Sequence, residues 1–133
     1  MENKVFLGGT CAETTWRDEL VGVLQVDSFN PVVDDWTEDC ITEEEMQKAN
    51  LCNIHLYVIT SEMKGVYSIA EVIQSSKTDG KLTILHIIPD GFSDGELRSL
   101  KAVCELVKKN GSIAYVDSEL FRTARVINFC FKD

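Results

Sequence analysis

The sequence lacks any apolar run long enough to cross a membrane, and it lacks any cluster of basic residues. A membrane-spanning helix needs about 20 consecutive apolar residues, and the N-terminus leads into an apolar segment without a signal-peptide pattern. The chain has 13 Lys and Arg against 22 Asp and Glu, a formal charge of −9. Binding to a nucleic-acid polymer depends on basic patches, so we expect neither a membrane nor DNA or RNA as a partner.

Metal and disulfide patterns are also missing. The five cysteines form no C-x-x-C pair and have no zinc-like spacing with the two histidines, so we expect no metal and no cofactor. An odd number of cysteines without a secretion signal indicates the reducing cytoplasm. His55 and His86 lie inside apolar segments, which is typical of core histidines. Cys11 follows a Gly-Gly turn, where thiol pKa values can fall, but a tightly fitting loop residue is the favoured interpretation.

Apolar segments of strand length alternate with helical patterns along the whole chain. The expected strands are residues 5–7, 25–29, 53–59, 82–88 and 112–116. This alternation predicts a single α/β domain over residues 1–133, with three layers and a mainly parallel five-stranded sheet of flavodoxin-like or Rossmann-like type. The first strand is not followed by G-x-G-x-x-G, so a dinucleotide fingerprint is absent.

Two segments carry less regular patterns. Residues 31–41 show neither a helical nor a strand period and predict a long loop, which in compact domains is usually functional. Thr42 and Glu45 then fit a capping box that opens a short helix ending at Leu51. The tail, residues 125–131, has a strand-like pattern and predicts either a sixth strand or an arm onto a neighbouring subunit.

Glu71 is the residue whose placement points most directly to chemistry. It follows the apolar strand 54–59 and a short loop, within the first turns of a helix. In an open α/β sheet the crevice at that strand-to-helix junction is where ligands bind. The positive end of the helix dipole favours an ionised carboxylate, which makes Glu71 a candidate nucleophile. The alternative is that the charge of Glu71 is merely favourable near the positive end of the helix dipole and that the residue has no chemical role.

Loops after the first three strands are expected to meet at one crevice. They contribute Gly8, Gly9 and Thr10 with Arg17 beyond, then Asn30, Pro31, Asp35 and Trp36, then Gly65 and Ser68. Backbone amides, an aromatic face and carboxylates together suit a ligand made of a sugar and a base.

Several of these residues also have simpler interpretations. Trp36 is either a ligand contact or a structural anchor, and Asp35 is either a ribose contact or a solvated loop charge. Ser68 either contacts a ribose hydroxyl or a phosphate of the ligand, or it is the N-cap residue of the helix. For Glu45, the simpler interpretation is that it only closes the capping box with Thr42.

The chain resembles the nucleoside 2-deoxyribosyltransferase-like family, in particular its short bacterial and phage branch, over about residues 4–76. The resemblance rests on the segments Leu7–Thr10, Trp16–Leu20, Phe29–Pro31, Asp34–Trp36 and, above all, Gly65–Glu71. It implies that Glu71 is the nucleophile that attacks the anomeric carbon, and that Glu45 is the acidic residue ahead of the third strand.

The resemblance further implies that the glycine loop binds the sugar and that a C-terminal segment of a neighbouring subunit completes the site. We therefore expect a homo-oligomer in which Asn128 reaches a neighbour's crevice. The family's enzymes usually carry a further Asp in the loop before the nucleophile, where this chain has Met63, Lys64 and Gly65.

Two functions are consistent with these features. The first is cleavage or transfer of the N-glycosidic bond of a (deoxy)nucleoside or nucleotide by Glu71. The second is a binding protein, a sensor or sponge for a nucleotide or an ADP-ribose derivative, which the missing loop Asp favours. A structural protein on the same scaffold is a third possibility, because fold alone does not define function.

Overall fold

The structure is a computed structural model that describes residues 2–11, 14–32 and 37–131. Its centre is a five-stranded sheet in the order β2-β1-β3-β4-β5, and all of its strand pairs are parallel. The strands are β1 (Lys4–Gly9), β2 (Asp27–Phe29), β3 (Ile54–Ile59), β4 (Leu82–Ile87) and β5 (Ile113–Val116). The predicted flavodoxin-like or Rossmann-like α/β fold is therefore confirmed.

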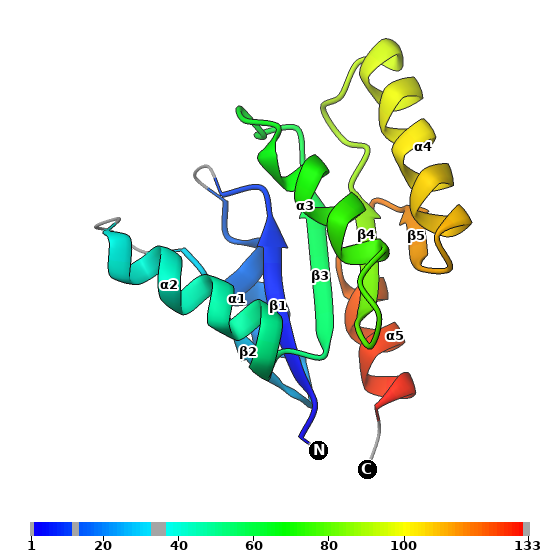
Figure 1. The fold of residues 1–133 in the computed structure, drawn as a ribbon. Helices are drawn as coiled ribbons and strands as arrows, with labels where there is room; N and C mark the ends of the chain where they lie inside the picture. The colour runs from blue at the N-terminus through cyan, green and yellow to red at the C-terminus, as the bar shows by residue number, and fades with distance from the viewer. Residues whose placement is uncertain (1, 12–13, 33–36, 132–133) are drawn as a thin grey trace.

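Helices cover both faces of this sheet, which makes three layers (Figure 1). The helices are α1 (Trp16–Val21), α2 (Glu38–Met46), the π-helical turn η1 (Gln47–Leu51), α3 (Tyr67–Ser76), α4 (Asp94–Lys109) and α5 (Phe121–Cys130). Helices α1 and α5 pack on one face, and α3 and α4 pack on the other. Alternate residues of β3 serve the two faces, as strand geometry requires: Leu56 packs toward α1 and Tyr57 toward α3.

Two predictions about local structure were wrong. Helix α2 begins at Glu38, so the loop before it is shorter than expected and Thr42 lies inside the helix. The Thr42 hydroxyl donates a hydrogen bond to the Glu38 carbonyl at 3.2 Å, a bond typical of a hydroxyl in a helix interior. No capping box opens at Thr42.

The tail is helix α5, neither a sixth strand nor an extended arm. Its buried residues Thr123, Ala124 and Ile127 have helical spacing, and the last two pack on the hydrophobic core of their own subunit. Phe129 is 85% exposed on the outer side of this helix. Val126, Ile127 and Phe131, which gave residues 125–131 their strand-like pattern, contact the core from this helix.

None of the helices within residues 2–11, 14–32 and 37–131 has the length and apolar character needed to span a bilayer.

Both histidines are buried and hydrogen-bonded, as predicted for core residues. His55 Nε2 lies 2.9 Å from the Lys48 carbonyl, which can only accept, so Nε2 carries the proton and Nδ1 accepts from Ser75 at 2.8 Å. In the same way, His86 Nε2 donates to the Asp117 carbonyl and His86 Nδ1 accepts from the Thr123 hydroxyl. Burial lowers the pKa of both histidines, so both are neutral in the folded protein.

This neutrality predicts that the protein loses stability in mild acid. In the unfolded chain each histidine takes up a proton below about pH 6.5, whereas in the folded protein uptake needs a lower pH. Because the unfolded state then binds more protons, the free energy of unfolding falls as the pH falls below that value. Urea unfolding between pH 7.5 and 5.5 measures the decline, and a His55→Gln/His86→Gln variant should show a shallower one. An equal decline in both proteins would contradict this assignment.

Candidate active site

A crevice opens at the carboxyl ends of β1 and β3, where the strand order reverses around β1. Ligands in open α/β sheets bind at such switch points. The crevice encloses about 540 Å³ and lies between the loop after β1, the start of α3 and the inner side of α2. Its lining residues are Phe6, Gly8, Gly9, Thr10, Cys11, Arg17, Pro31, Glu44, Met63, Lys64, Gly65, Tyr67, Ser68 and Glu71.

The end of β1 and the residue after it are fixed by hydrogen bonds to their backbone carbonyls. Buried Arg17 donates from Nε to the Leu7 carbonyl at 2.9 Å, from Nη1 to the Thr10 carbonyl at 2.7 Å and from Nη2 to the Gly9 carbonyl at 3.4 Å. Trp16 Nε1 also donates to the Thr10 carbonyl, at 3.0 Å. Burial lowers the pKa of Arg17, and the neighbouring Cys11 opposes that effect. The Arg17 guanidinium therefore fixes the backbone at the end of β1 through these three carbonyls.

Gly9 allows this loop to lie directly against β3. Its φ of +110° is one that residues with a side chain rarely adopt, and a Cβ there would lie 2.1 Å from the Val58 carbonyl oxygen. Thr10 continues the contact, because its amide donates to that same carbonyl and its hydroxyl accepts from the Thr60 amide, each at 2.9 Å. The sequence therefore specifies a close, rigid backbone wall on one side of the crevice.

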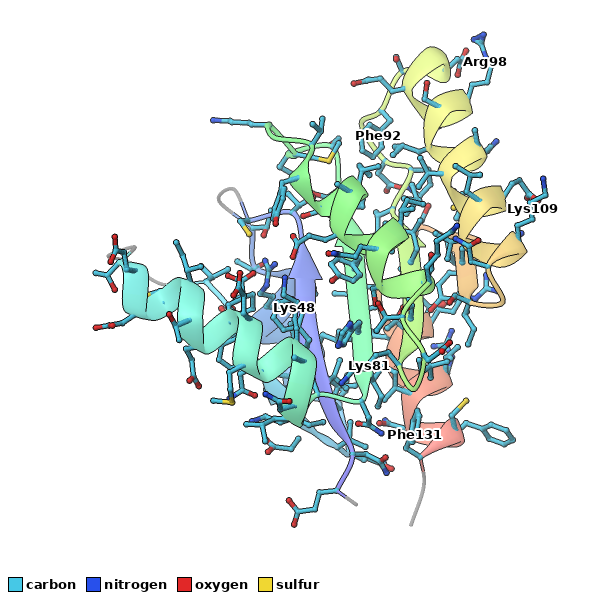
Figure 2. All side chains as sticks on the ribbon, viewed as in Figure 1. Lys48, Lys81, Phe92, Arg98, Lys109 and Phe131 are labelled. Carbon is cyan, nitrogen blue, oxygen red and sulfur yellow. The ribbon has the colours of Figure 1, made fainter. Side chains whose placement is uncertain are left out.

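Glu71 lies in the second turn of α3, opposite this wall. Its Oε2 accepts a hydrogen bond from Lys48 Nζ at 2.8 Å, and its side chain is 10% exposed. Lys48 projects over the sheet from η1, with Nζ 5.4 Å from the centre of the Phe6 ring (Figure 2). A cation over an aromatic face is favourable, so Phe6 supports the position of the ammonium group.

Glu44, one helical turn before Lys48, brings a second carboxylate into the crevice. Its Oε1 lies 3.9 Å from Lys48 Nζ, and its side chain is 18% exposed. Burial is the largest cause that raises the pKa of Glu44, and the charges of Glu71 and Glu45 add to it. Lys48 and Arg17 lower the pKa of Glu44 but do not cancel the rise. Burial together with Glu71 and Glu44 also raises the pKa of Tyr57 beneath them.

The turn that carries Lys48 is itself anchored to the core. Residues Gln47–Leu51 form a π-helical turn, a rare geometry that is frequent at functional sites. The His55 ring donates to the Lys48 carbonyl, and Ser75 and Thr83 complete a buried chain of hydrogen bonds behind it. The position of Lys48 is thus set by groups on β3, α3 and β4.

Two of the segments that carry the sequence resemblance, Leu7–Thr10 and Gly65–Glu71, contribute residues to this crevice. A family model described as nucleoside 2-deoxyribosyltransferase like matches residues 2–90, more than half of the chain. The chain belongs to this family. Neither a search of curated proteins nor a search of solved structures gives a match.

For this member of the nucleoside 2-deoxyribosyltransferase-like family, most of the predicted site residues lie together. Eight line the crevice: Gly8, Gly9, Thr10, Arg17, Pro31, Gly65, Ser68 and Glu71. Helix α3 has Val66 as its N-cap residue and no side-chain cap bond, so Ser68 is not the N-cap. Asp35 and Trp36 lie outside the described residues, and their contribution stays a prediction.

Three other predicted residues lie away from the crevice lining. Glu45 is exposed on α2 and borders a neighbouring recess between η1 and α3. The Asn30 side chain accepts from the Val32 amide at 2.9 Å and closes a local turn. Asn128 bonds the Gln25 amide and the Val23 carbonyl of its own chain, near the start of β2 and far from the carboxyl ends of the strands. A role for Asn128 in a neighbour's site stays a prediction.

The sequence reasoning missed Glu44, Lys48 and Phe6. The i, i+4 spacing of Glu44 and Lys48 on a helix was a signal available in the sequence. The expected helix already contained both residues, but the sequence alone does not show which side of that helix borders the crevice. Within residues 2–11, 14–32 and 37–131, no group of three or more His, Cys, Asp or Glu side chains could hold a metal ion.

Proposed function

We propose that this protein cleaves or transfers the N-glycosidic bond of a (deoxy)nucleoside or nucleotide, with Glu71 as the nucleophile. The observation that carries the proposal is the placement of the Glu71 carboxylate. It borders a crevice of about 540 Å³ opposite the rigid Gly8–Thr10 loop, at the switch point of the sheet. Family membership supports the same chemistry.

The reaction would follow the two-step course of a retaining glycosidase. A Glu71 oxygen attacks C1′, the bond from C1′ to the base breaks through an oxocarbenium-like transition state, and a glycosyl ester forms. Water or a second base then attacks C1′ from the side vacated by the first base. The backbone of the glycine loop and the Ser68 hydroxyl would hold the sugar, because both line the crevice beside Glu71.

The departing base needs a proton, and Glu44 is the best-placed donor. It lines the crevice together with Glu71, and its raised pKa favours the protonated form near neutral pH more than in an exposed glutamate. Tyr67, 73% exposed at the crevice mouth, offers an aromatic face for the base. Glu45 is less suited to proton donation because it is exposed and lines the neighbouring recess.

The experiment that tests the proposal is incubation of the protein with separate nucleosides, nucleoside 5′-monophosphates and NAD, with and without a second free base. Chromatography of each mixture measures the released base and any exchanged nucleoside. Base release from at least one compound is expected. Saturable binding by calorimetry without release from any compound would contradict the enzyme and favour a binding protein on the same fold.

The neighbouring residues Glu44 and Glu45 of α2 provide a sharper prediction. Glu44→Gln should lower base release about 100-fold or more, since a lost general acid has an effect of that size. Glu45→Gln removes an equal charge from the next position and should change base release only a few-fold. Steady-state rates of the two variants make the comparison. A larger loss in Glu45→Gln would restore the role that the sequence resemblance gave to Glu45.

A further inference from the structure

The ammonium group of Lys48 lies close to two carboxylates in the crevice, those of Glu71 and Glu44. Lys48 Nζ lies 2.8 Å from Glu71 Oε2 and 3.9 Å from Glu44 Oε1, with the three side chains between 10% and 21% exposed. A single cation stabilises one neighbouring negative charge better than two in such a partly desolvated place. The site therefore favours a state in which one of the two carboxyl groups holds a proton.

We propose that Lys48 is a shared counter-ion, paired with Glu71 before the reaction and with Glu44 after Glu71 has been esterified. Lys48 would thereby couple the loss of the Glu71 charge to the release of the Glu44 proton. This inference rests on the proposed function and deepens it. Lys48 acts through the two carboxylates and is a positioning residue.

The step balances in atoms and charge. The free site holds an ionised Glu71, a protonated Glu44 and a charged Lys48. A Glu71 oxygen forms a bond to C1′, the electron pair of the glycosidic bond goes to the base nitrogen, and that nitrogen takes the Glu44 proton. The product site holds a neutral ester at Glu71, an ionised Glu44 and the same charged Lys48. Each state therefore contains one anion and one cation.

The geometry allows this exchange without movement of the backbone. The Lys48 carbonyl is held by His55, and the ammonium lies over the Phe6 ring, so only the end of the side chain has to turn toward Glu44. Glu44 precedes Lys48 by one helical turn, the spacing at which side chains of a helix meet.

Other charged or titratable groups lie near Glu44 or line the same crevice. They are Glu45 on α2, Arg17 on α1, Tyr57 on β3, and Cys11, Lys64 and Tyr67 of the crevice lining. The Arg17 guanidinium is bound to loop carbonyls, so it is not a competing partner that could turn toward Glu44. Lys48 is the cation whose ammonium lies within 3.9 Å of both carboxylates.

The test measures the titration of Glu44 without any substrate. Protein with ¹³C-labelled glutamate carboxyls is titrated by NMR, and the Glu44 signal is assigned by its loss in Glu44→Gln. Glu71→Gln has a neutral side chain of the same size and stands in for the esterified state. The four proteins compared are wild type, Glu71→Gln, Lys48→Met and the double variant. Lys108→Met, which removes an exposed lysine on α4, is the control.

We expect the midpoint of the Glu44 titration to move to lower pH in Glu71→Gln, and to move clearly less when Lys48 is also replaced by Met. The control should titrate like wild type. An equal movement in both backgrounds, or none, would overturn the role of Lys48. Circular dichroism shows whether each variant is folded, and Lys48→Arg, which keeps the charge, should preserve the large movement if Lys48→Met is unstable.

Kinetics separate this inference from the proposed function. In Lys48→Met, the rate of base release should fall about 10-fold or more. The alkaline limb of its pH–rate profile should move to higher pH, because Glu44 loses the cation that lowers its pKa. Lys48→Arg should keep the limb of wild type. If Lys48→Met still releases base but the alkaline limb of its pH–rate profile is not shifted, the inference is overturned and the proposed function is not. Absence of base release in wild type would instead overturn the proposed function, whatever the NMR titrations show.

Discussion

Glu71→Gln is expected to reduce base release by roughly 10,000-fold or more, the size of loss seen when a covalent nucleophile is removed. The amide of Gln is neutral and a poor nucleophile, so no glycosyl ester can form. Its shape is close to that of Glu, so the substrate should still bind. Steady-state rates measure the loss, and calorimetry with the best substrate measures the retained binding.

Glu105→Gln is the matched control for this change. Glu105 lies on the exposed surface of α4 and pairs only weakly with Lys108, at 3.4 Å, so its replacement should leave both rate and binding unchanged. Turnover of Glu71→Gln within a few-fold of wild type would show that another group performs the attack.

Arg17→Met is expected to destabilise the protein by about 3 kcal/mol and to weaken ligand binding. The change removes charge-assisted hydrogen bonds to the carbonyls of Leu7, Gly9 and Thr10, and buried acceptors that lose their donor are costly. The loop after β1 would then no longer form a rigid wall opposite Glu71. Urea unfolding measures the stability, and calorimetry of ligand binding in Arg17→Met measures the second effect.

Two further variants show which property of Arg17 matters. Arg17→Lys keeps the charge but lacks the planar fork that reaches three carbonyls, so it should recover only part of the lost stability. Arg125→Met breaks an exposed ion pair with Glu119 at 2.8 Å and should change stability by less than about 1 kcal/mol. Equal stability of Arg17→Met and wild type would mean that the loop is held by other contacts.

The sequence predicted the sheet and one half of the crevice because both depend on local signals. Strands such as residues 82–88 are nearly continuous apolar runs, as expected when helices cover both faces of a sheet. Gly9 is the last residue of β1 and Glu71 lies in α3, the helix that follows β3, and parallel strands bring their carboxyl ends to one edge. Their proximity therefore followed from strand order without any knowledge of side chains.

The other half depends on where α2 begins and on contacts between distant segments. Thr42 and Glu45 have the spacing of a capping box, but the helix begins at Glu38, so Glu45 has no capping role, and it is Glu44 that lines the crevice while Glu45 lines the neighbouring recess. The Lys48–Glu71 ion pair joins residues 23 positions apart, and no local pattern specifies it. The tail was misjudged for a related reason, since α5 shows its helical pattern only once Ala124 and Ile127 have a core to pack against.

The most direct measurement of the central claim is mass spectrometry of the protein quenched during turnover of its best substrate. A fraction of the wild-type protein should be heavier by one glycosyl group, with the added mass on the peptide that contains Glu71, and this fraction should be absent from Glu71→Gln. Base release with no covalent adduct in wild type, or with an adduct on a different residue, would contradict the assignment of Glu71 as the nucleophile.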